Sequence, residues 1–322
     1  MSRKSEPSIS FGDLAVDQLV NPKHRLMQID ELIDWSGIEF RLRLSLVKSR
    51  GRPPYPPLQM FKALLLQVWY NLSDEGLEDS LLDRLSFRRF CGLKVNDPTP
   101  DAITIGRFRA SLKREGEKLF EAINSQLDKK GMMVKSGTLV DATIIQAAVN
   151  PPSKGNQVSS KDGEAGWAVK NNDYTFGYKA HLGVDEESGL IRKARLTDGS
   201  LHDSLGLGAC VSGDEAAVYA DKAYDSRALR EMLKSQDIEP CLMHRLRKGD
   251  PERCLKAQLN KAYSSVRSKV ERTFGTFKRT YGWNRVRYIG EAKNQVFLFL
   301  VSIAFNLRRA LSIEAGRAKM LA

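Results

Sequence analysis

The strongest constraint in this 322-residue sequence is a change of its hydrophobic pattern near Gly131. Before that residue, apolar side chains recur at helical spacings, whereas after it short β-rich apolar runs are separated by polar turns. One chain that carries both patterns is expected to form two structural regions. We therefore predict an all-α N-terminal domain over residues 1–130 and an α/β domain over residues 131–322.

In the N-terminal region, residues 58–70 read LQMFKALLLQVWY and are apolar on more than one side, as in a buried bundle helix. Ser73 and Asp101 are predicted to cap the helices that follow them. The helix after Asp101, over residues 102–115, carries Arg107, Arg109 and Arg114. Short helices joined by tight turns are compatible with a helix-turn-helix that reads DNA, and equally with a bundle that contacts no DNA.

The second region opens with three predicted strands in succession and continues with helices and strands in alternation. We expect the strands at 138–145, 176–184, 190–196, 216–220 and 238–243, and the helices near 203 and at 226–234, 261–280 and 291–311. The polar stretch at about 150–173 is interpreted as a loop or insertion. This order predicts a mixed sheet flanked by helices, which is the order of an RNase H-like core.

Charge is distributed very unevenly along the chain. Its net charge is +12, yet residues 241–322 hold 18 Lys/Arg against 5 Asp/Glu, and residues 1–240 hold 33 against 34. A field this asymmetric favours a polyanionic partner, most simply nucleic acid, although a basic surface can also serve solubility alone. With 42% hydrophobic and 28% charged residues, wholesale disorder is excluded.

Several classes of protein are disfavoured by what the sequence lacks. The four cysteines are scattered without a C-x-x-C pair, so we expect neither a disulfide framework nor a zinc ribbon, and a reducing cytoplasm fits best. The longest apolar runs fall far short of the roughly 20 residues that span a membrane. The first residues, MSRKSEPSISFGD, contain no apolar segment typical of a secretory signal. We therefore expect no membrane partner.

Two aspartates stand where predicted strands could bring them to one edge of the sheet. Asp141 lies inside the apolar run LVDATII, where an ionised carboxylate is costly unless it is paired or binds a metal. Asp221 ends the predicted strand 216–220, and open α/β sheets bind ligands beyond the carboxyl ends of their strands. Each could instead be a simple turn or cap residue, and Asp225 is an alternative second ligand.

A third acidic residue, Glu271, lies on the predicted helix 261–280. Val266, Val270, Phe274 and Phe277 form the expected buried stripe of that helix. At about 100° per residue, Arg267 and Lys278 lie within about 40° of Glu271, on the same side of the helix. One acid between two bases can be an ordinary surface ion pair. Together with the two aspartates on the strands, this glutamate can instead bind hard divalent cations. The two bases beside it can then hold the phosphodiester in position.

At these residues the sequence resembles the bacterial DDE transposases of the IS-five group. The similar blocks are Thr138–Ile145, Phe176–Asp185, Ala220–Tyr224, the helix signature Arg267-x3-Glu271-x6-Lys278, and Val286-Arg287-Tyr288-x-Gly290. In the N-terminal region, residues 51–56 and 69–74 are similar as well. Two departures occur: Tyr263 precedes Arg267 by four places rather than three, and Lys222-Ala223 replaces the usual small pair.

The resemblance implies a transposase that binds the terminal inverted repeats of its own element, cleaves DNA strands and joins the ends to target DNA. It implies that Asp141, Asp221 and Glu271 bind Mg2+, as two ions for which Mn2+ can substitute. The cationic residues expected to bind DNA are Arg267, Lys278, Lys222, Arg272 and Arg279. It further implies a homodimer on double-stranded DNA, in the bacterial cytoplasm with the nucleoid. The alternatives are an RNase H-like nuclease that joins no strands and a catalytically silent DNA-binding repressor of transposition.

Overall fold

The computed structural model describes residues 19–46, 55–151, 161–170 and 172–321. The chain divides into two compact units, Met1–Glu115 and Gly116–Ala322. The sequence placed this boundary later, at residue 130. The difference is helix α8 (Gly116–Lys129), which packs against helix α11 (Glu291–Leu321) in the second unit. The rings of Phe120 and Phe299 stack there with centroids 5.8 Å apart.

The described part of the first unit is all-helical, as the sequence predicts. Its helices are α2 (Arg25–Leu32), α3 (Trp35–Leu46), α4 (Pro57–Trp69), α5 (Asp74–Asp83), α6 (Leu85–Cys91) and α7 (Ala102–Ser111), followed by the 3-10 turn η1 (Leu112–Arg114). Both predicted caps are confirmed, because Ser73 accepts from the Gly76 N–H at 2.9 Å and Asp101 from the Thr104 N–H at 2.6 Å. The sequence analysis had not identified α2 and α3.

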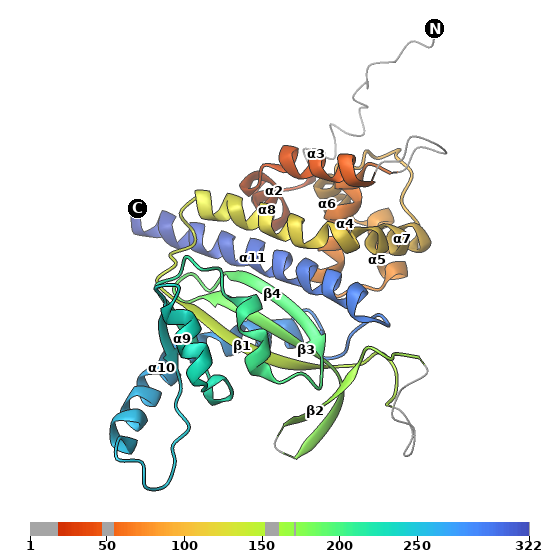
Figure 1. Cartoon of the computed structure of the whole chain (residues 1–322). Coiled ribbons are helices and arrows are strands. Elements are labelled where there is room, and N and C mark those ends of the chain that lie inside the picture. The colour runs from red at the N-terminus through yellow and green to blue at the C-terminus, as the bar shows by residue number, and fades with distance from the viewer. Residues whose placement is uncertain (1–18, 47–54, 152–160, 171, 322) are drawn as a thin grey trace. The chain divides into compact units, whose positions relative to one another are not determined.

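The second unit contains a mixed six-stranded sheet (Figure 1). Its strands are β1 (Thr138–Gln146), β2 (Gly166–Lys170), β3 (Asp173–Asp185), β4 (Ile191–Asp198), β5 (Ala217–Ala220) and β6 (Glu239–Leu242). The strand order is β4-β3-β1-β5-β6, with β2 beside the first part of β3. β3 is antiparallel to both neighbours, whereas β1, β5 and β6 are parallel. The predicted succession of strands followed by helix–strand units is confirmed, except that four strands rather than three come first, because β2 precedes β3.

Strand β2 lies inside the stretch that was interpreted as a polar loop. Residues 166–170 pair with residues 173–177 of β3 and form a two-stranded ribbon. The interpretation was wrong for this part because the alternation of Trp167 and Val169 with smaller residues is short and surrounded by polar sequence. Residues 152–160 and 171 of that stretch lie outside the described residues.

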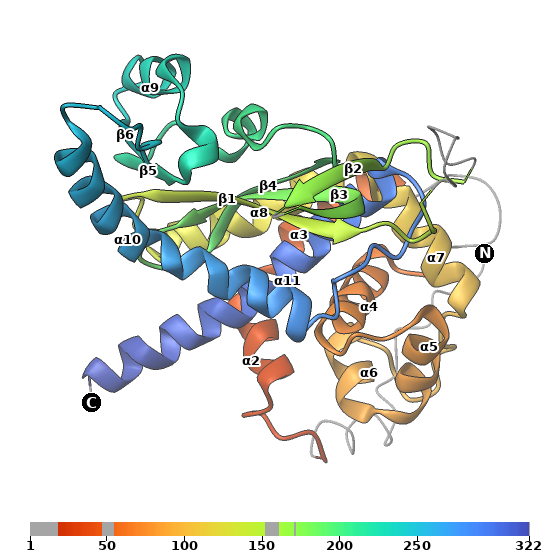
Figure 2. The same ribbon diagram turned by 90° about the horizontal axis from the view of Figure 1, so that it is seen from below.

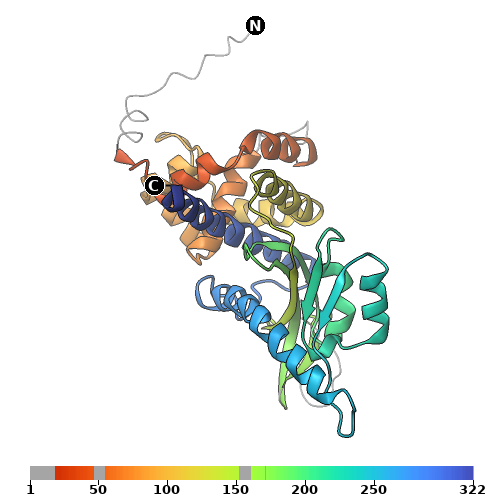
Figure 3. The same cartoon turned by 90° about the vertical axis from the view of Figure 1, so that its left-hand side faces the viewer.

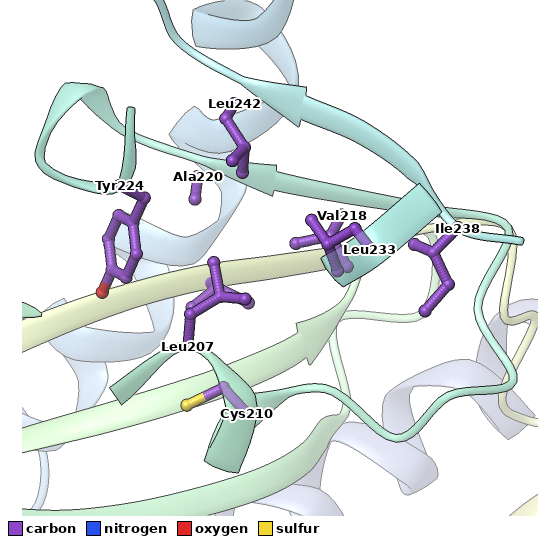
Figure 4. Packing of buried hydrophobic residues seen from close by; sticks show 9 residues of the cluster. Leu207, Cys210, Val218, Ala220, Tyr224, Leu233, Ile238 and Leu242 are labelled. Carbon is purple, nitrogen blue, oxygen red and sulfur yellow. The ribbon is translucent and has the colours of Figure 1, made fainter. Parts of the chain in front are cut away.

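Helices cover both faces of the sheet (Figures 2 and 3). One face packs against helix α10 (Arg253–Arg279), which runs along β1 and β5. The other carries the 3-10 turns η2 (Asp203–Gly206), η3 (Gly208–Cys210) and η4 (Lys222–Tyr224) and helix α9 (Arg227–Lys234). The helix predicted near residue 203 is thus a pair of 3-10 turns. Figure 4 shows the apolar cluster on this second face, where Leu207, Tyr224 and Leu233 meet side chains of the strands.

Helix α11 is long and apolar enough to cross a membrane, by length and composition alone. Two thirds of its most apolar window, 67%, is nevertheless buried inside the protein. The helix packs on α8 and β4, and Asn306 and Gln295 accept from the backbone N–H groups of Ile191 and Leu196 on β4. α11 therefore forms part of the core and covers an edge strand that would otherwise expose unpaired backbone groups.

Candidate functional site

The first two predicted carboxylates lie side by side at the edge of the parallel part of the sheet. Thr138 of β1 pairs with Val218 of β5, and Leu139 pairs with Tyr219. Two residues further along the same register, Asp141 is level with Asp221, which directly follows β5. Neighbouring strands are about 4.8 Å apart, so the two backbones hold these carboxylates close together.

Both aspartates face helix α10. Successive side chains of a strand alternate between the faces of a sheet, so Asp141 lies on the face of Leu139, and Asp221 on that of Tyr219. The Tyr219 ring contacts the ring of Tyr263 on α10, with centroids 6.0 Å apart. Tyr263 therefore packs against the sheet.

Arg267 of α10 extends across the end of β5. Its Nη2 lies 3.4 Å from Asp141 Oδ2 on β1, and its Nη1 lies 3.5 Å from the Met243 sulfur, just after β6. Because β5 lies between β1 and β6, the guanidinium spans the strand that ends at Asp221. Its Nε is buried without a hydrogen-bond partner. Arg267 is thus a cation held directly at Asp141, beside the strand end at which Asp221 lies.

Glu271 lies one helical turn beyond Arg267, about 6 Å further along the α10 axis. Its side chain is exposed, and within the described ranges no cation pairs with it. The expected buried stripe of α10 is confirmed for Val270, Phe274 and Phe277, whereas Val266 is half-buried. This packing directs Glu271 to the flank of α10 that also carries Arg267.

The donor chemistry suits a hard divalent cation, because carboxylate oxygens are the ligands that such ions prefer. The spacing of the three carboxylates fits a metal site only in part. Among the residues that the structure describes, no group of three His, Cys, Asp or Glu side chains stands close enough to hold a metal ion. Asp141 and Asp221 are adjacent, while Glu271 stands apart and Asp141 pairs with Arg267.

The alternative ligand Asp225 has a structural role. Its Oδ1 accepts from Arg230 Nη2 at 2.9 Å, and its Oδ2 accepts from the Arg245 N–H at 2.7 Å. Burial raises the pKa of Asp225, but these two donors outweigh burial and hold the pKa below its usual range. Both oxygens are therefore engaged in fixing the chain after β6. Asp221 makes one such contact, accepting from the Ala223 N–H at 2.8 Å.

The predicted DNA-binding cations fall into separate groups. Arg267 and half-buried Lys278 lie on the Glu271 flank of α10, and Lys222 is exposed directly after Asp221. Arg272 instead lines a cavity of about 530 Å³ between α10, α11 and the β3–β4 turn. Arg279 lies about 20° from Arg272 in helical angle and about 120° from Arg267. These two arginines therefore face away from the aspartates.

The sequence analysis assigned no role to Tyr224 of η4, which lies in the apolar cluster on the second face of the sheet (Figure 4). Its hydroxyl is buried without a hydrogen-bond partner. Burial, followed by nearby acidic groups that include Asp141 and Asp221, raises the pKa of Tyr224 well above its ordinary value. The phenol therefore stays protonated. The only signal in the sequence was its place three residues after Asp221.

The arginines predicted for a DNA-reading helix in the first unit have different environments. Arg109 is buried and forms a two-pronged ion pair with Asp74, with both N–O distances 2.7 Å. Arg109 also donates to Gln67 Oε1 at 3.1 Å. This arginine joins α7 to α4 and α5 and is unavailable to DNA, whereas Arg107 and Arg114 are exposed.

The chain is also similar to known proteins. Residues 133–307, more than half of the chain, match the family described as "Transposase DDE domain". Residues 14–111 match "Transposase domain (DUF772)". A cryo-EM structure of the piggyBac transposase synaptic complex with hairpin DNA is similar at a TM-score of 0.51 and 10% identity, covering 91% of this chain and 76% of that one. This structural similarity, together with the strand order of the sheet, shows that the second unit has an RNase H-like fold.

A Mos1 transposase paired-end complex with the left transposon end also matches, with 12% identity over 80% of this chain and 82% of that one. Its TM-score is 0.21, and this match carries no structural argument.

Proposed function

This chain belongs to the family of DDE transposases, and on that premise we propose that Asp141, Asp221 and Glu271 are its catalytic residues. As a member of this family, it is a DNA-cleaving and strand-transferring enzyme. The observation that carries the assignment is the β1–β5 register, which places Asp141 level with Asp221 under the Arg267 guanidinium. Glu271 is the acid nearest along the same flank of α10.

We propose Mg2+ as the cofactor, probed with Mn2+ as a substitute. Asp141 and Asp221 would hold it together, and Glu271 would complete the donor set. When bound, a pair of such ions activates the attacking oxygen and stabilises the leaving oxygen of a phosphoryl transfer. The acids alone repel DNA, so the cations of the chain have to attract the phosphate. Arg267 and Lys278 supply that charge beside the carboxylates.

The remaining features of the activity are also proposals. We place the chain in the IS-five group because Arg267-x3-Glu271-x6-Lys278 matches the signature of that group. The DNA would carry the terminal inverted repeats of the element, and a homodimer would hold two ends together. The buried, unpaired thiols Cys91, Cys210 and Cys241 suit a reducing compartment, consistent with a bacterial cytoplasmic protein that acts at the nucleoid.

The test uses labelled duplexes that carry the inverted repeats bordering this reading frame, with Mg2+, with Mn2+ or with EDTA. We expect metal-dependent cleavage at the repeat ends and joined products when target DNA is added. Cleavage without joined products would make the chain a nuclease. Binding without cleavage by the full chain would make it a repressor. Light scattering of the DNA complex then tests for two copies of the chain per complex.

A further inference from the structure

The loop between β6 and α10, residues 243–252, is held to the sheet by buried polar contacts. Arg230 of α9 donates to the carbonyl oxygens of Pro240 and Leu242, at 3.2 and 2.8 Å, and to His244 Nδ1 at 3.2 Å. The same guanidinium pairs with Asp225 at 2.9 Å. One half-buried arginine thus fixes the end of β6 and the start of the loop.

A second set of contacts fixes the loop from the side of α10. Asn260, buried on α10, accepts from the His244 N–H at 2.7 Å and donates to the His244 carbonyl at 2.9 Å. Asp225 accepts from the Arg245 N–H at 2.7 Å. Backbone groups at two successive loop residues are therefore fixed by buried or half-buried side chains, so the direction in which the following residues leave the sheet is defined.

This scaffold presents three exposed cations: Arg245, Arg247 and Lys248. The acids later in the loop, Asp250 and Glu252, pair with Lys256 at 2.8 and 3.2 Å, and the charge of Arg247 helps to lower the pKa of Asp250. Within the part of the chain that the structure describes, no carboxylate forms an ion pair with the three cations. A loop that presents three exposed cations close together attracts an anion.

The loop lies at the candidate active site. Ala220 of β5 pairs with Leu242 of β6, so Asp221 is level with Met243, where the loop begins. Arg245 Nε donates to the Lys222 carbonyl at 2.9 Å, which places its guanidinium one residue from Asp221. Arg267 reaches Asp141 from α10 and also contacts Met243, the first residue of this loop.

We propose that Arg245, Arg247 and Lys248 form a second phosphate-binding site, which holds the DNA backbone on the Asp221 side of the reacting phosphate. The site rests on the proposed function, and it assigns residues that neither the sequence motifs nor the family resemblance singled out. The DNA strand then crosses the carboxylates between two cationic flanks, with Arg267 and Lys278 on one side and this loop on the other. Gripping a strand on both sides fixes the phosphate at the carboxylates, which is the positioning that phosphoryl transfer requires.

The experiment measures binding of a fluorescent inverted-repeat duplex in EDTA, over a range of KCl concentrations. Each lost phosphate contact lowers the salt slope of log affinity by about 0.9. We therefore expect a decrease of about 1.8 for the double variant R245A/R247A. The matched control is R227A/K234A, which removes the same charge from exposed positions of neighbouring α9. Its slope should stay that of the unaltered protein.

A second measurement uses the unaltered protein and replaces single phosphates of the duplex by neutral methylphosphonates. Neutral linkages on one side of the cleavage position should weaken binding by the unaltered protein and leave R245A/R247A unaffected. Equal slopes for R245A/R247A and the unaltered protein, or equal losses at every linkage, would overturn the second site. If the unaltered protein still cleaves and joins DNA, the proposed function survives that result. A full chain that neither binds nor cleaves these duplexes overturns both.

Discussion

Each unit of the molecule contains a half-buried or buried arginine paired with an aspartate, and the two pairs are built differently. In the first unit, Arg109 meets both oxygens of Asp74 at 2.7 Å and also donates to Gln67. In the second, Arg267 meets one oxygen of Asp141 at 3.4 Å, and its Nε is buried without a partner. The chemical groups are the same, but the second arginine makes a longer contact and leaves its Nε without a hydrogen-bond partner.

The two pairs differ in how fully their contacts offset the cost of burying a charge. Burying a charge is costly unless geometry and hydrogen bonds compensate it, and the Arg109 pair meets that condition within the protein. The Arg267 pair meets it incompletely, at the end of β5 where Asp221 also lies. We infer that the second pair completes its contacts with a ligand, which for a DDE transposase is the phosphate of DNA.

The largest expected effect of breaking either pair is on stability, in the first unit. Arg109→Ala leaves Asp74 without its cation, and removing one partner of a buried pair costs about 3 kcal/mol. Urea unfolding of the full chain should show this loss. The neighbouring exposed residue provides the control, since Arg107→Ala should change stability by less than about 0.5 kcal/mol. Equal losses for both variants would remove the structural role assigned to Arg109.

A third basic side chain, His181, shows how burial changes the pKa of a basic group that has no acidic side chain in direct contact. It is fully buried on β3, hydrogen-bonded to Thr197 at 2.9 Å, and burial lowers its pKa to about 4. Because an unfolded histidine titrates near 6.5, the unfolded chain binds more protons between these values. Stability should therefore fall by about 2 kcal/mol from pH 7 to pH 5.

Urea unfolding at the two pH values measures that loss. His181→Gln should flatten the dependence, whereas the exposed His202→Gln should not. A pH dependence that persists unchanged in His181→Gln would show that other groups cause it.

At the site, removing the arginine should change activity more than stability. Arg267→Ala is expected to lower the rate of DNA cleavage at least about 10-fold, since it removes the cation beside the reacting phosphate. The free energy of unfolding should fall by less than for Arg109→Ala, because Arg267 makes one contact of 3.4 Å with Asp141 rather than two of 2.7 Å. Arg267→Lys should restore part of the rate. A large loss of stability with an unchanged rate would make this pair a second structural pair.

The smallest effect is expected on the far flank of α10. Arg272 lines the cavity beside α11 rather than the aspartates, so Arg272→Ala should lower cleavage less than 2-fold at a saturating DNA concentration. Lys278→Ala, on the Glu271 flank, should lower it more. Cleavage rates of the two variants, measured on one labelled duplex, show which residue contributes more to cleavage. A larger loss for Arg272→Ala would reverse the assignment of the two flanks.

Much of the fold followed from local pattern. Ser73 and Asp101 cap helices as expected, and the apolar runs around Asp141 and before Asp221 are strands. Two features were missed because tertiary packing decides them. α8 looks like another bundle helix in sequence, yet it packs on α11, and β2 is a short strand whose pairing with β3 compensates its polar surroundings.

The site was predictable as a set of residue types, but not as an arrangement. Spacing placed Arg267, Glu271 and Lys278 on one side of α10, and strand context selected Asp141 and Asp221. The sequence could not show that Asp225 is engaged by Arg230, because that contact depends on how α9 folds back on β6. Nor could it separate buried Arg109 from exposed Arg107 on the same helix.

The central claim is that Glu271 acts chemically with Asp141 and Asp221, and one comparison tests it most directly. Glu271→Gln keeps the shape of an exposed side chain and removes its charge, so folding and DNA binding should persist. With Mg2+ and labelled inverted-repeat duplex, we expect the unaltered protein to cleave and the variant to lose at least about 100-fold in rate, with equal binding in EDTA. Equal cleavage by both proteins would contradict the account and leave Glu271 an ordinary surface residue of α10.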